Sequence, residues 1–230
     1  INPQTTDYPV FVFTTAGAYC ELGHMIMGCT SGSAKGAIEM QTGGLFGNHI
    51  HHCGFGLWGK GSSDAAFGIS VTGGTTPTIG EMMYGVIEHC KFGSLLTVSG
   101  IQIPTGFVGP NSVKGTIIRN NHFNTGVRSI NVLATHADFA SGGIYNNTFE
   151  VPDSADGEAV YFASGAAGNV HGNAAWVADG VQMGNNPFFD AGGTGMGFGI
   201  NTRGGGERET WSAGQGTWAG SGALPTPTNI

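Results

Sequence analysis

The stretch GTIIRNNHF, residues 115–123, decides the fold, because the same pattern returns along the chain. An apolar residue stands near the middle, an Asn or His follows it, and an aromatic residue comes three positions after that Asn or His. The copies are GNHIHHCGF (47–55), YGVIEHCKF (84–92), GTIIRNNHF (115–123), GGIYNNTF (142–149) and GNVHGNAAW (168–176). Such self-similarity is the sequence signature of repeat architectures.

Three positions recur in every copy. The apolar members are Ile50, Ile87, Ile118, Ile144 and Val170; the polar members are His52, His89, Asn120, Asn146 and Asn173; the aromatic members are Phe55, Phe92, Phe123, Phe149 and Trp176. Successive polar members are 37, 31, 26 and 27 residues apart. Segments 61–81 and 99–112, rich in Gly, Pro, Ser and Thr, are interpreted as insertions that lengthen the early intervals.

Between the copies lie short β-branched or aromatic runs without a helical period, namely GISV (68–71), LLTV (95–98), SINVLA (129–134) and AVYFA (159–163). A period in the twenties with two or three short strands predicts one coil of a parallel β-solenoid. Each coil then places a residue over its equivalent, about 4.8 Å away. We therefore expect the apolar members to form one internal file and the aromatic members another.

The polar members should lie at a corner of each coil. Asn tolerates the left-handed backbone that a tight corner demands, and stacked Asn side chains can form a hydrogen-bonded ladder. We expect this ladder at Asn120, Asn146 and Asn173, with His52 and His89 at the same corner in the earlier coils.

Composition agrees with an all-β chain and excludes several classes of partner. Of 230 residues, 43 are glycine and only 10% are charged, which disfavours amphipathic helices. The net charge is -7 and the eight Lys and Arg are scattered, so no basic stripe indicates nucleic-acid binding. No apolar run reaches the roughly 18 residues of a membrane span. The chain begins with Ile1, and we expect a leader or larger N-terminal region to have preceded it.

The recurring Gly, Ile, Asn and Phe of GTIIRNNHF and GGIYNNTF resemble the right-handed parallel β-helix family, which includes pectate lyases and phage tailspikes. The resemblance implies one solenoid over residues 1–180, with an N-terminal cap that YPVFVF (8–13) and HMIM (24–27) could supply, or an early coil in its place. Residues 181–230, rich in Gly and aromatic residues, would form a C-terminal cap or an oligomerisation arm. The resemblance also implies a homo-oligomer, most plausibly a trimer.

Two clusters invite a metal interpretation. His49 and His51 alternate onto one face of a strand beside His52, but only Cys53 adjoins them, and it should point away from His52. Asp153, Asp156 and Glu158 offer oxygen ligands for weak calcium binding, which the sequence leaves open, without the spacing of the twelve-residue calcium loop. We expect no metal and no cofactor.

Cys53 and Cys90 fall at equivalent positions, with Cα atoms roughly 5 Å apart if their coils are adjacent, so that a disulfide and a buried pair of free thiols both stay open.

Glycan cleavage needs paired carboxylates, or a carboxylate-bound calcium with a basic residue, and few carboxylates here fall at stackable positions. Glu88 and Arg119 should form an ion pair across coils, and His136 with Asp138 is the best acid–base couple by spacing. We expect no catalytic residue, although enzymatic activity stays open.

The sequence therefore favours a non-catalytic structural β-solenoid of a virus particle, either capsid-decorating or tailspike-like. The alternative is an extracellular polysaccharide lyase or glycosidase. Expected partners are further copies of the chain and other virion proteins or a surface polysaccharide, with a virion or extracellular location.

Overall fold

The computed structural model describes residues 11–13, 19–27, 33–40, 47–57, 65–71, 82–103, 113–125, 128–133, 139, 142–150, 158–162, 167–177, 180–190 and 196–198. Every regular element within these ranges is a β-strand, which confirms the expected all-β class. None of the described residues belongs to a helix long and apolar enough to cross a membrane.

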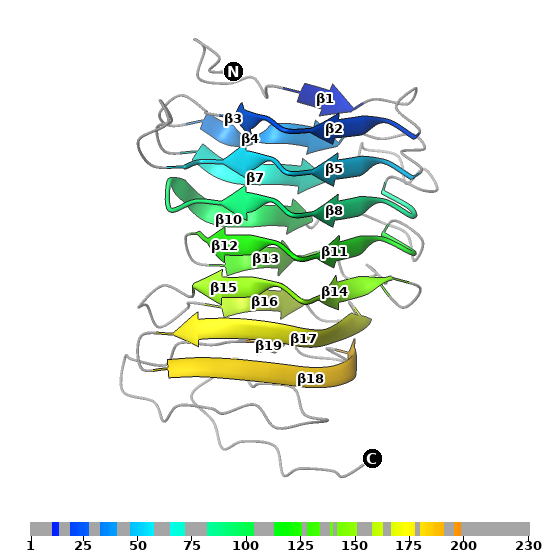
Figure 1. Cartoon of the computed structure of the whole chain (residues 1–230), viewed down its shortest axis with the longest axis vertical. Coiled ribbons are helices and arrows are strands. Elements are labelled where there is room, and N and C mark those ends of the chain that lie inside the picture. The colour runs from blue at the N-terminus through cyan, green and yellow to red at the C-terminus, as the bar shows by residue number, and fades with distance from the viewer. Residues whose placement is uncertain are drawn as a thin grey trace.

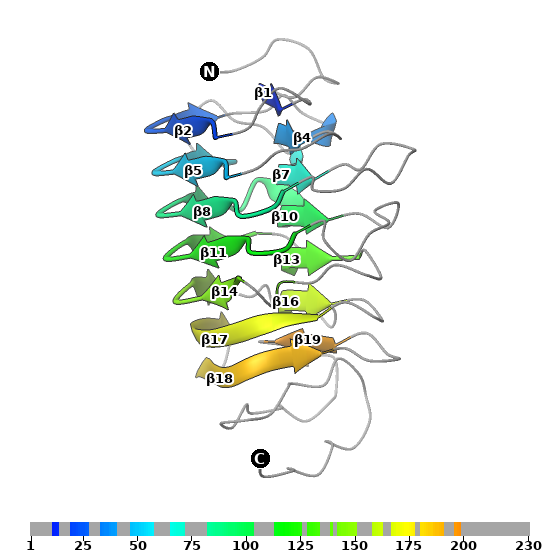
Figure 2. The same cartoon turned by 90° about the vertical axis from the view of Figure 1, so that its right-hand side faces the viewer.

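The strands stack in three columns, which the chain visits in turn as it winds down the molecule (Figures 1 and 2). The first column is β2 (Glu21–Gly23), β5 (His49–His51), β8 (Val86–Glu88), β11 (Ile117–Arg119) and β14 (Gly143–Tyr145). The second is β3 (Ile26–Met27), β6 (Gly54–Phe55), β9 (Lys91–Phe92), β12 (His122–Asn124) and β15 (Thr148–Glu150). The third is β1 (Phe11–Phe13), β4 (Ser33–Met40), β7 (Ala65–Val71), β10 (Leu96–Ile103), β13 (Arg128–Val132) and β16 (Glu158–Phe162).

Neighbouring strands within each of these columns pair in parallel, so the chain is a parallel β-helix. The long strand β17 (Ala167–Val177) pairs with both β14 and β15 and so joins the first two columns into one sheet. β1 pairs with β4, so part of the segment 8–13 belongs to an early coil. The expected insertions are wrong in part, because residues 65–71 of the segment 61–81 form β7 and residues 99–103 of the segment 99–112 complete β10.

The expected apolar file is confirmed and begins one coil earlier than the sequence pattern indicated. Strand register stacks one buried residue from each coil, and each is at most 9% exposed. Its members are Leu22, Ile50, Ile87, Ile118, Ile144 and Val170. The third column contributes a second file, Ile38, Ile69, Ile101, Ile130 and Val160. Burial of these files removes apolar surface from water at about 25 cal/mol per Å².

The aromatic file is confirmed for four of its five expected members. Ring centroids of Phe55, Phe92, Phe123 and Phe149 are 4.8, 4.5 and 5.0 Å apart, with interplanar angles of 17°, 5° and 17°. The fifth assignment is wrong, because Ala175 pairs with Phe149, whereas Trp176 pairs with Glu150.

This correction follows from the corner that precedes the aromatic position. The corner residues have positive φ, and they are His24 (57°), His52 (51°), His89 (53°), Asn120 (54°), Asn146 (56°) and Gly172 (64°). His52 and His89 therefore take the corner position, as expected, but in β17 the corner residue is Gly172 and not Asn173. Glycine adopts this conformation without steric cost, so the sequence pattern based on Asn shifts by one residue there.

The hydrogen-bonded ladder contains Asn173, as expected, but its other members each follow the expected residue, Asn120 or Asn146, by one position. Asn120 and Asn146 are exposed, whereas the residues that follow them are buried and bonded across coils. The Asn147 side-chain oxygen accepts the backbone N–H of Asn121 at 3.0 Å, and that of Asn173 accepts the N–H of Asn147 at 2.9 Å. The ladder is therefore Asn121, Asn147 and Asn173, and it satisfies backbone donors that the tight corner leaves without a strand partner.

At the far end, β18 (Gly180–Asp190) pairs antiparallel with β17, and β19 (Met196–Phe198) pairs antiparallel with β16. These strands cover the exposed edges of the last coil, which would otherwise offer unpaired backbone groups. The division at residue 180 and the role of the C-terminal arm stay predictions, and residues 199–230 lie outside the described residues.

Candidate functional site

Histidine rings stack on the outside of the corner between the first and second columns. The ring centroids of His24 and His52 are 4.9 Å apart, and those of His52 and His89 are 5.0 Å apart, with interplanar angles of 20° and 23°. The left-handed corner turns these side chains away from the core, and the coil repeat sets their spacing. Three consecutive coils therefore present one imidazole each at the same place.

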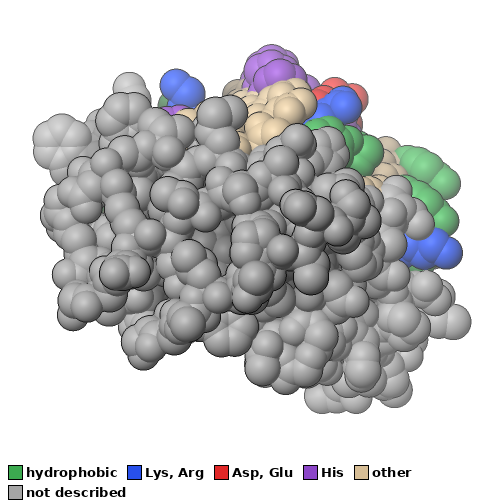
Figure 3. All heavy atoms as spheres, turned by 90° about the horizontal axis from the view of Figure 1, so that it is seen from below, with side chains coloured by type: hydrophobic (Ala, Val, Ile, Leu, Met, Phe, Trp, Pro, Cys, Tyr) green, Lys and Arg blue, Asp and Glu red, His purple; other side chains and the backbone are tan. Residues whose placement is uncertain are grey.

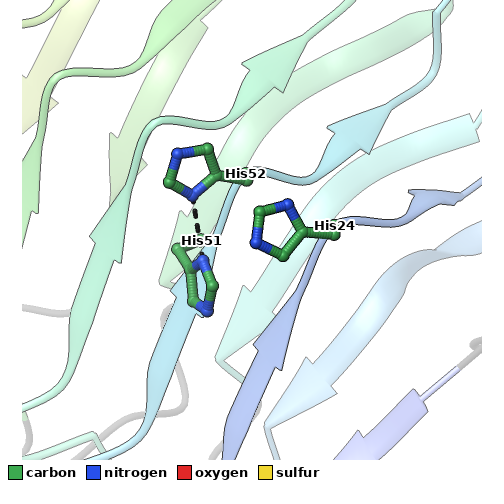
Figure 4. Close-up of side chains that lie close together, drawn as sticks. All are labelled: His24, His51 and His52. Carbon is green, nitrogen blue, oxygen red and sulfur yellow. Dashed lines mark hydrogen bonds between the residues drawn. The ribbon is translucent and has the colours of Figure 1, made fainter.

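His51, the last residue of β5, lies beside this stack and is only 8% exposed. Its Nε2 is 2.8 Å from Glu21 Oε1. Figure 4 shows the hydrogen bond on its other side, where its Nδ1 is 2.9 Å from Nδ1 of His52. Gly23 makes room for the ring, because a Cβ at this position would lie 2.4 Å from the imidazole. His51 is thereby held between a carboxylate of the preceding coil and the neighbouring corner histidine.

A second group of polar side chains lies on the same side of the first column and extends from β5 to β8 and β11. His49 Nε2 is 2.9 Å from Glu88 Oε1, and Arg119 Nε donates to Glu88 Oε2 at 2.7 Å. The predicted cross-coil ion pair of Glu88 and Arg119 is confirmed. Desolvation opposes ionisation of Glu88, but the hydrogen bonds from Arg119 and His49 outweigh it and lower the pKa of this carboxyl below its ordinary value.

The charge state of the corner stack follows from its crowding. Partial desolvation lowers the pKa of His52 from its ordinary value, and the positive charges that His24, His89 and His51 would carry lower it further. Because like charges 5 Å apart repel one another, the stack disfavours the charged form of His52.

Seen along the axis from the C-terminal end, histidine side chains gather at one edge of the molecule, next to acidic and basic side chains (Figure 3). Among the residues that the structure describes, two sets of three side chains place their nitrogen or oxygen atoms within 4.8 Å of one another. They are His24, His51 and His52, and Glu21, His49 and His51. Neutral imidazole and carboxylate are common ligands of zinc and related divalent ions.

Sequence reasoning considered His49, His51 and His52 but found no further ligand near them. The structure brings Glu21 and His24 to these residues from the preceding coil. The lack of further ligands is therefore no longer an argument for the expectation that no metal binds here. The signal was present, because ELGHMIM (21–27) lies 28 residues before HIHHCGF (49–55) and pairs with it in register. It has His24 at the polar position but Met27 at the aromatic position, which made it hard to recognise as a copy of the repeat.

Cys53 and Cys90 occupy the position that Asn121 takes in the next coil. Both are free and buried, so the disulfide alternative is wrong in this structure. Cys53 Sγ lies 3.2 Å from the His51 carbonyl oxygen and Cys90 Sγ lies 3.3 Å from that of Glu88, and both thiols donate there. The hydrogen bond with Cys53 and burial raise the pKa of Cys90. These thiols face the interior and not the histidines.

The other candidates fall where the structure gives no side chains. Asp153, Asp156, His136 and Asp138 lie outside the described residues, and for Glu158 only the backbone, in β16, is described. Calcium binding and the His136–Asp138 couple therefore stay untested.

No protein-family model matches the chain, and neither a curated protein nor a solved structure matches it significantly.

Proposed function

We propose that the chain is a non-catalytic structural β-solenoid of a virus particle, with a capsid-decorating or tailspike-like role, and that it assembles as a homotrimer. The observation that carries this proposal is the continuity of the internal files. Apolar, aromatic and amide side chains stack from coil to coil with buried backbone donors satisfied along the way.

Continuous internal files of this kind suit a protein whose function requires high stability. In a solenoid each coil contacts only its neighbours, so the total stability is approximately the sum of the stabilities of the coils and of the interfaces between them. A weak coil is therefore a site of local unfolding. Stacked phenylalanines at about the favoured aromatic spacing join the coils from Phe55 to Phe149, and hydrogen bonds between amide side chains join the coils of Asn121, Asn147 and Asn173. A rigid rod that resists local opening fits a particle component.

The carboxylate at the centre of the polar groups supports the non-catalytic interpretation. A glycosidase needs one carboxylic acid with a raised pKa to protonate the leaving group. Glu88 has the opposite environment, because Arg119 and His49 hold its carboxyl in the ionised form. The carboxylate of Glu88 in β8 therefore links three coils, because it binds His49 in β5 and Arg119 in β11.

The proposal is tested by the mass of the purified chain in solution together with a cleavage screen. Size exclusion with light scattering should give three times the chain mass of 23.5 kDa. Incubation with acidic and neutral polysaccharides should release no reducing ends or unsaturated products. A monomer that depolymerises a polysaccharide would overturn the proposal in favour of an extracellular lyase or glycosidase.

A further inference from the structure

We propose that His24, His51 and His52 bind one divalent transition-metal ion, with Zn²⁺ as the best fit, on the outer face of the corner. The site goes beyond the structural role proposed above and does not depend on it. It joins the coil of β2 and β3 to the coil of β5 and β6.

The distances between the ligand atoms suit a small ion. A tetrahedral site with Zn–N bonds of about 2.0–2.1 Å separates its nitrogen ligands by about 3.3 Å. The Nδ1 atoms of His51 and His52 are 2.9 Å apart, and all three histidines keep a nitrogen within 4.8 Å of the other two. His24 and His52 are exposed, so side-chain rotation can bring their nitrogens to an ion without a change in the backbone.

The buried member of the site is already oriented for coordination. The Glu21 carboxylate can only accept, so Nε2 of His51 carries the proton of that hydrogen bond and Nδ1 keeps its lone pair. A carboxylate that holds the second nitrogen of a metal-bound histidine is a recurrent feature of zinc sites. His51 Nδ1 points at His52, whose own Nδ1–H donates to it in the metal-free protein. On metal binding that proton moves to Nε2 of His52, and Nδ1 becomes a ligand.

The geometry favours this set over Glu21, His49 and His51. His49 is already bound to Glu88, and the guanidinium of Arg119 is on the same carboxylate. If His49 bound a cation, it would lose its hydrogen bond with Glu88, and the cation would lie near the positive charge of Arg119. The set of His24, His51 and His52 gives up only the hydrogen bond between His51 and His52.

The position of the site gives the ion a structural role. The buried amide ladder links the later coils, beginning where Asn121 accepts from Cys90 N–H at 2.9 Å. In the two preceding coils the same position is taken by Met25 and Cys53, neither of which carries an amide. Histidines from two adjacent coils meet at one ion where this ladder is absent, so the metal would fasten those coils together.

The test uses the full chain without a histidine tag, stripped with a chelator and titrated with Zn²⁺ by isothermal calorimetry. One ion per chain should bind, and Zn²⁺ should raise the melting temperature, because a ligand that binds only the folded state stabilises it. Co²⁺ in place of Zn²⁺ should give the intense visible absorption of a four-coordinate site.

Variants chosen from the chain's own corners keep the fold intact. His52→Asn introduces the residue that occupies this corner as Asn120 and Asn146, and it should weaken Zn²⁺ binding by about tenfold or more. His89→Asn makes the same change at the next corner, outside the ligand set, and should leave the affinity unchanged. Absence of Zn²⁺ binding to the stripped wild type, or equal binding by wild type and His52→Asn, would overturn the proposal.

Two further variants separate the two candidate sets. His49→Gln should bind Zn²⁺ as the wild type does, whereas His24→Asn should lose binding. The reverse result would assign the ion to Glu21, His49 and His51 and would also overturn the proposal.

Discussion

Replacement of Asn147 by alanine tests the buried ladder, which is the most specific polar feature of the interior. The side chain of Asn147 is 1% exposed. Its nitrogen donates to the carbonyl oxygen of Ile118 and to Oδ1 of Asn173, both at 3.0 Å, and its oxygen accepts from the backbone N–H and the side chain of Asn121. The nitrogen also donates to the carbonyl oxygen of Tyr145 at 3.1 Å, so the substitution Asn147→Ala removes five hydrogen bonds at once.

The loss of stability follows from the hydrogen bonds that the partners of Asn147 keep after the substitution. The side chain of Asn121 still donates to the Ile87 carbonyl, and Oδ1 of Asn173 still accepts the N–H of residue 147. The backbone N–H of Asn121 loses its acceptor, and a buried orphan donor costs about 1–3 kcal/mol. Net loss of the remaining bonds adds about 1 kcal/mol. We expect Asn147→Ala to lower the free energy of unfolding by about 2–4 kcal/mol.

The measurement is equilibrium unfolding in guanidinium chloride followed by far-ultraviolet circular dichroism, with unfolding rates in its place if refolding is incomplete. The matched control is Asn146→Gly, which removes the same side chain one residue earlier, at an exposed corner with φ of 56°. Gly172 occupies that corner in β17, so the control should stay within about 0.5 kcal/mol of wild type. Equal effects of the two substitutions, or a negligible effect of Asn147→Ala, would refute the ladder as a source of stability.

Three further outcomes follow from the described contacts. The hydrogen bond from Arg119 outweighs desolvation and keeps the folded-state pKa of Glu88 below its unfolded value, so the pair stabilises the protein above a pH of about 4.3, and this stabilisation is lost as the pH falls through the folded-state pKa. Glu88→Gln should therefore lower the free energy of unfolding by about 1 kcal/mol or less at pH 7 and make it less sensitive to acid. Urea unfolding at pH 7 and pH 3 measures both effects. Gly100→Ala should lower the unfolding free energy by about 1–3 kcal/mol, because its Cβ would lie 2.7 Å from the ring of Phe123, and an unchanged melting temperature would contradict this close packing. The Cys90 thiol, 1% exposed, should react with iodoacetamide only as fast as the chain unfolds, and rapid labelling of the native protein would show that the interior is open there.

The architecture and its main apolar file could be predicted from the sequence. Every coil must bury the same position, so Ile118, Ile144 and Val170 recur at nearly constant spacing and the period appears in the sequence itself. The cross-coil pair of Glu88 and Arg119 could be predicted for the same reason, since both stand at equivalent places in consecutive copies.

Two features depended on the tertiary structure. Gly172 and Asn120 meet the same backbone requirement with different side chains, so the residue type did not mark the corner. In β17 the corner and the aromatic position therefore lie one residue before the expected ones. The histidine site was hidden for a different reason. The coil at residues 21–27 has Met27 where the later coils have phenylalanine, so it was not recognised as a copy of the repeat. His24 and His52, 28 residues apart in the sequence, become neighbours only once the strands pair.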